Sequence, residues 1–83
     1  MNDAEIEERT LFVLYEYWTK NGDEYMGRDE VGKEVPISDA AMDRVVRHLA
    51  NLGLVELYEV IGSEFHSVKL TPHGIEEVRS LMA

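Results

Sequence analysis

The 83-residue sequence predicts a single α+β domain, residues 1–83, in which three helices precede a two-stranded antiparallel hairpin and a fourth helix ends the chain. Apolar residues recur at helical spacing as far as Gly53, where the pattern becomes that of extended strands rich in Val, Ile, Leu and Tyr. Helical spacing returns after Pro72. A chain of this length buries one small core, so no second domain is expected.

The composition excludes several classes of protein. Apolar residues make up 45% of the chain and charged residues 30%, which indicates a globular domain and not a disordered segment. There is no cysteine, which excludes disulfides and thiolate metal sites. No apolar run approaches the roughly 18 residues of a membrane helix, and the acidic start does not resemble a secretory signal. We therefore expect a soluble, cytoplasmic protein without a membrane partner.

The first helix is predicted over residues 4–20, which contain neither Gly nor Pro and have an apolar stripe at three- and four-residue spacing. Asn2 or Asp3 can cap its start, and Asn21-Gly22 ends it. The stripe consists of Ile6, Thr10, Val13, Leu14, Tyr17 and Trp18. Apolar surface continues beyond this stripe at Leu11, Phe12 and Tyr15. This width predicts burial on two sides, or against a partner helix.

A short second helix is predicted over residues 28–34, after a loop in which Tyr25 and Met26 can anchor a short extended stretch against the core. Val31 points inward in this helix, and Pro36 prevents its continuation.

A longer third helix is predicted over residues 38–52. Ser38 is a favoured N-cap, and Gly53 is suited to follow the end of the helix. The apolar residues at helical spacing are Met42, Val46, Leu49 and Leu52. The opposite face presents Ala40, Asp43, Arg44, Arg47, His48 and Asn51.

The hairpin is predicted from strands at 54–61 and 64–70, joined by a two-residue type II′ turn at Gly62-Ser63. Thr71 then caps a last helix that has Pro72 in its first position. The inner edge of this helix is predicted to consist of Ile75, Val78, Leu81 and Met82. One core is expected to combine Leu14 and Trp18 with Met42, Val46, Leu49, Leu54 and Val78.

In this order, the elements resemble those of the winged helix-turn-helix family, in particular small MarR-, ArsR- and PadR-like transcriptional regulators of bacteria and archaea. The resemblance covers nearly the whole chain and rests on Val31-Gly32, Ile37-Ser38, residues 49–55 and Leu70-Thr71-Pro72-His73-Gly74. It implies a three-helix helix-turn-helix core with the hairpin as a wing. It also implies a transcriptional regulator that inserts helix 38–52 into the major groove of double-stranded DNA.

The surface of the third helix provides most of the candidate DNA-binding residues. Arg44 and Arg47 are three residues apart and share a face, so one guanidinium can pair with guanine and the other with phosphate. This interpretation requires that they turn toward a common partner and not toward the protein's own carboxylates. The alternative is a solvated face with an internal Asp43–Arg47 pair. The candidate DNA-binding residues are Ser38, Ala40, Ala41, Asp43, Arg44, Arg47, His48, Arg28 and Lys33.

The predicted wing fits DNA binding poorly. Wing tips that contact DNA usually provide Arg or Lys, whereas this hairpin has Glu56 and Glu59 on its incoming strand and Glu64 beside the turn. A carboxylate repels phosphate, so the third helix should provide most of any DNA contact. The candidate wing residues are Gly62, Ser63, His66 and Lys69.

The net charge of −9, from 17 acidic and 8 basic residues, opposes DNA binding because phosphate contacts supply most non-specific affinity. Its distribution decides between two functions. If the acidic residues lie away from a shared basic face, DNA binding is retained. If they surround the third helix, a protein–protein interaction module that does not bind DNA is favoured. Acidity with few lysines is also typical of proteins at high internal salt, where repulsion from phosphate is screened.

No enzyme, metal site or cofactor is expected. His48, His66 and His73 lie on three different predicted elements and lack the short spacing of metal ligands. No carboxylate pair accompanies a nucleophile, and there is no glycine-rich phosphate loop.

Self-association is expected to involve the first or last helix. Tyr17 and Trp18 are expected to pack in the core, and the remaining aromatic residues can form a self-association patch, since aromatic residues are enriched at interfaces. The candidate homodimer residues are Leu11, Tyr15, Trp18 and Leu81.

Overall fold

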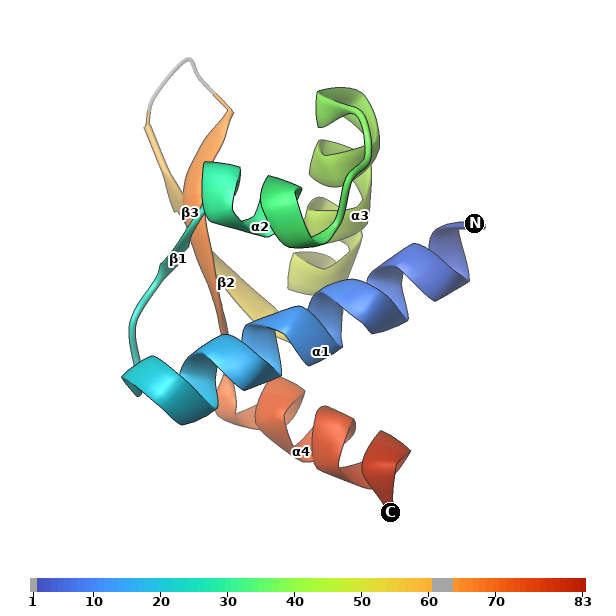
Figure 1. Ribbon diagram of the computed structural model, residues 1–83, viewed down its shortest axis with the longest axis vertical. Coiled ribbons are helices and arrows are strands. Elements are labelled where there is room, and N and C mark those ends of the chain that lie inside the picture. Colours follow the sequence, from blue (N-terminus) through green and yellow to red (C-terminus); the bar gives the residue numbers. More distant parts are fainter. Residues whose placement is uncertain (1, 61–63) are drawn as a thin grey trace.

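The computed structural model describes residues 2–60 and 64–83 and shows the predicted order of elements there (Figure 1). In chain order they are α1 (Asp3–Asn21), β1 (Met26–Gly27), α2 (Arg28–Glu34), α3 (Asp39–Asn51), β2 (Val55–Glu59), β3 (Phe65–Leu70) and α4 (Pro72–Met82). The α+β architecture is confirmed, and α2 has its predicted bounds. The predicted Gly62-Ser63 turn lies outside the described residues.

Three helices begin at the capping side chains that the sequence predicted. In each, the side-chain oxygen accepts a hydrogen bond from the backbone N–H three residues later, at 2.9–3.1 Å. The caps are Asn2 for α1, Ser38 for α3 and Thr71 for α4. After α3, Gly53 adopts a φ of +76°, the left-handed conformation that favours glycine at the end of a helix.

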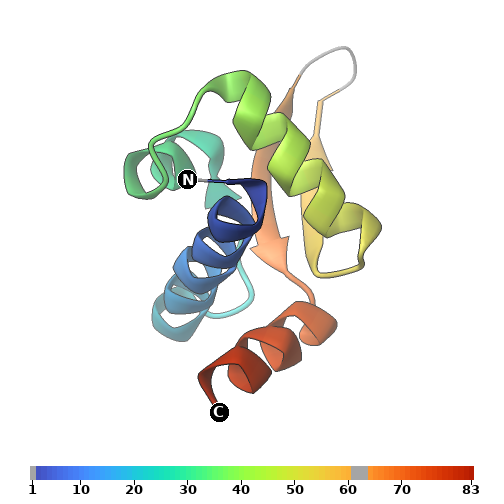
Figure 2. The ribbon, with the colours of Figure 1, turned by 90° about the vertical axis from the view of Figure 1, so that its right-hand side faces the viewer.

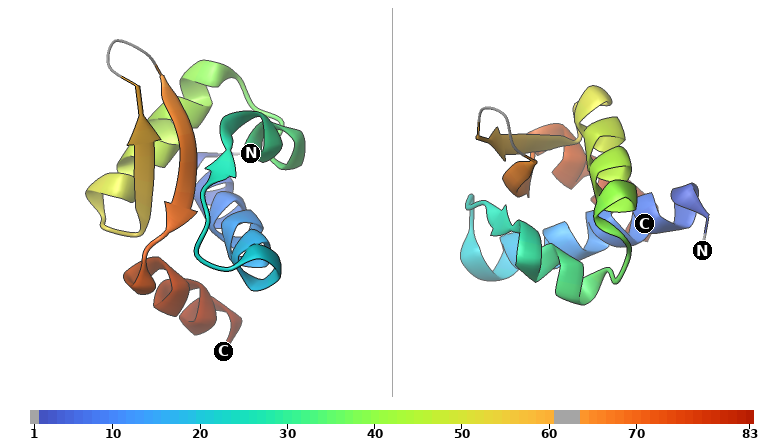
Figure 3. Two further views of the ribbon diagram at one scale, coloured as in Figure 1. Left: turned by 90° about the vertical axis from the view of Figure 1, so that its left-hand side faces the viewer. Right: turned by 90° about the horizontal axis from the view of Figure 1, so that it is seen from above.

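The sheet has three strands, where the sequence predicted two. Its order is β1-β3-β2 with antiparallel pairing, and Met26 pairs with Val68 on the additional edge (Figure 3, left). The extended stretch predicted at Tyr25 and Met26 therefore forms part of the sheet. A two-residue strand is too short to produce an alternating sequence pattern, which is why the sequence did not predict it.

A bulge in β3 changes which side chains face the core. Tyr58 pairs with Ser67, but Glu59 pairs with Phe65, so His66 is an extra residue in β3. In a regular strand, Phe65 and Val68 would lie on opposite faces because they are three residues apart. With the bulge both are buried, at 1% and 0% exposure. His66 is exposed.

The core lies around α1, which crosses the molecule and contacts α2, α3, α4 and β3 (Figures 1 and 2). Burial of α1 on several sides is thus confirmed. The buried apolar residues are Ile6, Leu11, Leu14, Met26, Val31, Val35, Met42, Val45, Val46, Leu49, Leu54, Val55, Phe65, Val68, Leu70 and Val78. None of the helices in the described part of the chain is long and apolar enough to cross a bilayer.

Seven residues predicted to face inward are not fully buried. Val13, Tyr17, Trp18 and Ile75 are half-buried. Leu52 is 51% exposed because it is the C-cap of α3, where the chain turns toward β2. Leu81 and Met82 are exposed because they lie in the last turn of α4, at the C-terminal end of the chain (Figure 1).

The start of α4 is held closely against the end of α3. The Thr71 hydroxyl donates a hydrogen bond to the Gly53 carbonyl at 2.6 Å, and the Thr71 N–H donates to the Leu54 carbonyl at 3.1 Å. Gly74 then packs directly on Leu54, and a Cβ atom at this position would overlap the Leu54 carbonyl oxygen. These contacts bring together in space the two sequence motifs that contain Gly53 and Gly74.

We predict that Gly74→Ala lowers the free energy of unfolding by about 1–3 kcal/mol, because the added methyl group forces the backbone of α4 away from Leu54. The matched control is Gly32→Ala in α2, where the new Cβ would lie 3.6 Å from Met42 Cε, an ordinary contact. This control should gain up to about 1 kcal/mol, because alanine favours a helix interior over glycine. Urea denaturation measures both, and equal effects of the two substitutions would contradict the prediction.

Candidate nucleic-acid interface

Helix α3 presents one face to solvent. Its other face is held in the core by Met42, Val45, Val46 and Leu49. The exposed face includes Ala40, with Ala41 half-buried beside it. It also places together three of the predicted DNA-binding residues, which we call the α3 basic triad: Arg44, Arg47 and His48. Their side chains are 58%, 49% and 54% exposed.

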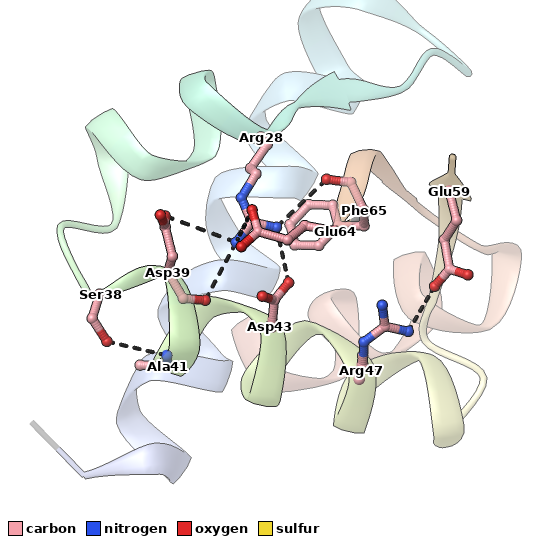
Figure 4. A network of polar contacts seen from close by, with 9 residues as sticks. All are labelled: Arg28, Ser38, Asp39, Ala41, Asp43, Arg47, Glu59, Glu64 and Phe65. Carbon is pink, nitrogen blue, oxygen red and sulfur yellow. Dashed lines mark hydrogen bonds and ion pairs between the residues drawn. The ribbon is translucent and has the colours of Figure 1, made fainter. Parts of the chain in front are cut away.

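Each member of the α3 basic triad contacts a carboxylate from another element. Arg44 forms two hydrogen bonds to Asp3 of α1, from Nε at 2.9 Å and from Nη2 at 3.0 Å. Arg47 donates to Glu59 of β2 at 2.7 Å (Figure 4). His48 Nδ1 contacts Glu7 Oε1 of α1. The protein's own carboxylates thus pair with all three members of the α3 basic triad.

Arg28 is engaged by groups of the protein itself. Its guanidinium lies between α2, α3 and β3, and its side chain is only 14% exposed (Figure 4). Nη1 donates to Asp43 Oδ1 at 2.9 Å, and Nη2 lies 3.4 Å from Glu64 Oε2. The guanidinium also stacks 4.5 Å from the centre of the Phe65 ring. The hydrogen bond that Arg28 donates to Asp43 raises the pKa of Arg28 above its ordinary value, so this side chain stays charged.

Arg28 and Asp43 pair with each other, and a contact of either residue with DNA stays a prediction. The alternative of an internal Asp43–Arg47 pair is wrong. Asp43 faces Arg28, while Arg47 turns toward the sheet and meets Glu59 (Figure 4).

Acidic side chains surround α3. Arg28 and the α3 basic triad contact six carboxylates, twice the number of arginines involved. The six are Asp3, Glu7, Asp39, Asp43, Glu59 and Glu64. The requirement that Arg44 and Arg47 face away from the protein's own carboxylates is not met in this arrangement.

Solved structures with the same arrangement of elements identify the fold. A protein from Ralstonia eutropha to which DNA binding is attributed superposes with a TM-score of 0.82 at 22% identity, over 95% of this chain and 96% of its own. MepR from Staphylococcus aureus, in its DNA-binding conformation, gives 0.74 at 18% identity, over 93% of this chain and 54% of its own. The chain has the winged-helix fold.

A third winged-helix match is ZitR from Lactococcus lactis, with a TM-score of 0.72 at 17% identity, over 98% of this chain and 57% of its own. The chain thus spans little more than half the length of MepR and ZitR. The sequence matches no protein-family model and no curated protein. At these identities the likeness establishes the winged-helix fold and no more.

The described part of the wing has few side chains that could bind DNA. Gly62 and Ser63, two of the predicted wing residues, lie outside the described residues. His66 is exposed, and its ring packs edge-on against Tyr58 at 5.6 Å between centroids.

Lys69 lies at the base of the wing, at the end of β3 away from the turn. Its Nζ lies 3.2 Å from Asp23 Oδ1 and 4.9 Å from the centre of the Tyr25 ring. The hydrogen bond to Asp23 raises the pKa of Lys69. These contacts engage the ammonium group on the outer surface of the sheet, and the role of Lys69 as a wing cation for DNA stays a prediction.

Ser38 and Lys33, two further predicted DNA-binding residues, lie in different parts of the fold. Ser38 caps α3 as predicted, and its contribution to phosphate binding stays a prediction. Lys33 lines an open hollow of about 300 Å³ between α1 and α2, together with Glu30 and Tyr17, and no α3 residue lines this hollow. The fold thus does not bring Lys33 into the α3 basic triad.

The predicted self-association surface is only partly available. Leu11 is 5% exposed and belongs to the core, so its assignment to an interface is wrong. Tyr15 and Trp18 are half-buried, with the Arg79 guanidinium 5.5 Å from the centre of the Trp18 ring. Leu81 is 46% exposed. A homodimer through Tyr15, Trp18 and Leu81 stays a prediction.

Sequence reasoning missed the carboxylates that contact the α3 basic triad. Asp3 is 41 residues from Arg44, Glu7 is 41 from His48, and Glu59 is 12 from Arg47. No local spacing pattern connects these pairs, because they depend on how α1 and β2 pack beside α3.

We predict that Arg28→Ala lowers the free energy of unfolding by about 1.5–3 kcal/mol, because it leaves the half-buried Asp43 without its charged hydrogen-bond donor. Arg44→Ala, which removes an exposed arginine from the same surface, should cost much less. Urea denaturation of both variants tests this difference. An Arg28→Ala variant as stable as Arg44→Ala would show that Arg28 does not hold α3 in place.

A second prediction concerns pH. The Arg44 hydrogen bonds lower the pKa of Asp3, so the stability that Asp3 provides is present above its ordinary pKa and is lost as pH falls through the lowered value. The difference in melting temperature between the wild type and Asp3→Asn should therefore shrink from neutral pH toward pH ~2. In an Arg44→Ala background, the difference in melting temperature caused by Asp3→Asn should not change with pH. A pH-dependent difference in that background would show that another group causes the effect.

Proposed function

We propose that this protein binds double-stranded DNA through α3 and acts as a transcription regulator, without enzymatic activity. The single observation that supports this is the α3 basic triad, presented on the open face of a helix whose other face is fixed in the core. The fold adds support. MepR, which shares it, is a transcription regulator of the Staphylococcus aureus multidrug efflux pump MepA, and one of its structures is in a DNA-binding conformation.

The carboxylates at Arg44 and Arg47 do not prevent this role. Both pairs are about half exposed, and exposed ion pairs contribute little to stability because water and salt compete with them. Phosphate is an equally good bidentate acceptor for a guanidinium. DNA can therefore replace Asp3 and Glu59 as the partner of these arginines, whereas Arg28 stays in place.

The proposed contacts divide by position along α3. Arg44 and Arg47 take a phosphate and a guanine edge. Ala40 and Ala41, near the start of the helix, allow close approach and contact with a thymine methyl group. With so few hydrogen-bonding groups at this end, we expect modest sequence specificity.

A second candidate function is a protein-docking module that does not bind DNA. It is favoured by the six carboxylates around α3 and by the net charge of −9. These features raise the cost of bringing a phosphate backbone to α3.

We predict that the wild type binds mixed-sequence duplex DNA at low salt and that Arg44→Ala/Arg47→Ala binds more weakly. Because one of the two arginines is proposed to contact a phosphate, the slope of log affinity against log salt should become shallower by about 0.9 in the double variant. Fluorescence anisotropy over a KCl titration measures this slope. The matched control is Arg9→Ala/Arg79→Ala, which removes two arginines from α1 and α4 and should leave the slope nearly unchanged.

Two outcomes would contradict the proposal. Equal weakening by the two double variants would show that only net charge matters. Absence of wild-type binding at low salt, with no gain on neutralising acidic residues, would favour the protein-docking module.

A further inference from the structure

We propose that Asp3 and Glu59 act as intramolecular competitors of DNA phosphate at Arg44 and Arg47, so that the protein's own carboxylates limit its affinity for DNA. This inference rests on the proposed function and specifies how the same surface is regulated.

The Asp3–Arg44 pair has the geometry of phosphate recognition. Both carboxylate oxygens of Asp3 are used, one by Nε at 2.9 Å and the other by Nη2 at 3.0 Å. This two-point contact matches the fork of the guanidinium, and it is the arrangement with which arginine binds phosphate or guanine. While Asp3 is in place, Arg44 cannot offer the same two donors to DNA.

Glu59 pairs with the second arginine, Arg47. It ends β2, and its Oε1 accepts a hydrogen bond from Arg47 Nη1 at 2.7 Å (Figure 4). Asp3 comes from α1 and Glu59 from β2, so the two competitors approach the helix from different elements. Neither carboxylate belongs to α3.

Displacing these carboxylates lowers the affinity for DNA in two ways. The ion pair must open, and the released carboxylate then remains beside the incoming phosphate, which it repels. The exposure of both pairs means that opening them needs no unfolding, so the competition is reversible and depends on salt. Arg28 differs, because its side chain is 14% exposed and fixed by Asp43 and Phe65.

The test compares the DNA affinity of the wild type with that of Asp3→Asn, Glu59→Gln and the double variant, using fluorescence anisotropy with one mixed-sequence duplex at several KCl concentrations. Each single substitution should tighten binding about two- to fivefold, the range expected for an exposed ion pair, and the double variant about tenfold. The matched control is Glu8→Gln/Glu76→Gln, which changes the net charge equally. Glu8 lines a hollow with Glu34 of α2, and Glu76 is exposed on α4. Melting temperatures of all variants verify that they are folded.

A mutant cycle isolates the competition itself. In an Arg44→Ala background, Asp3→Asn should tighten binding much less than it does in the wild type, because only the repulsion between the carboxylate and phosphate is then relieved. Tightening that is undiminished in this background, or that the control variant shares, would overturn the inference and assign the effect to net charge.

The remaining outcomes separate this inference from the proposed function. Wild-type binding with unchanged affinity in the double variant overturns the inference alone. Binding by the double variant and not by the wild type supports both. Absence of binding by every variant at low salt overturns both.

Discussion

One guanidinium group, that of Arg28, joins α3 to the elements packed beside it. It is hydrogen-bonded to Asp43 of α3, stacked on Phe65 of β3, and attached to the first residue of α2, so it connects three elements at one point (Figure 4). A helix packed in this way presents one defined face to solvent. The cost is that one of only eight basic residues is removed from the surface that would meet DNA.

Around this fixed helix, shape and charge favour different partners. The winged-helix fold and the open face of α3 suit a DNA groove. The carboxylates of α1 and β2, however, leave that face without the positive charge that usually attracts DNA. Competition between phosphate and Asp3 or Glu59 would make this fold compatible with this charge. The two arginines would then stay ion-paired with the protein's own carboxylates until a ligand that forms stronger contacts displaces them.

The predictable features of this chain are those set by neighbouring residues. Caps at Ser38 and Thr71 and the left-handed Gly53 were predictable because their hydrogen bonds and conformations are local. The partner of Arg44 was not, because it is contributed by a helix 41 residues away. Leu11 was misassigned for a related reason: a wide apolar surface on α1 does not show which part will be covered by other elements.

The extra residue in β3 affects how hairpins of this kind should be aligned. Because His66 shifts the register, Phe65 turns inward and supports Arg28 from below. A homologue that lacks this one insertion would keep its hairpin but turn the equivalent aromatic ring outward, which would loosen α2 from α3. Alignments of such hairpins should therefore superimpose residues that pair with the same partner across the hairpin. A gap of one residue at this point would indicate a chain in which α2 and α3 are connected by different contacts.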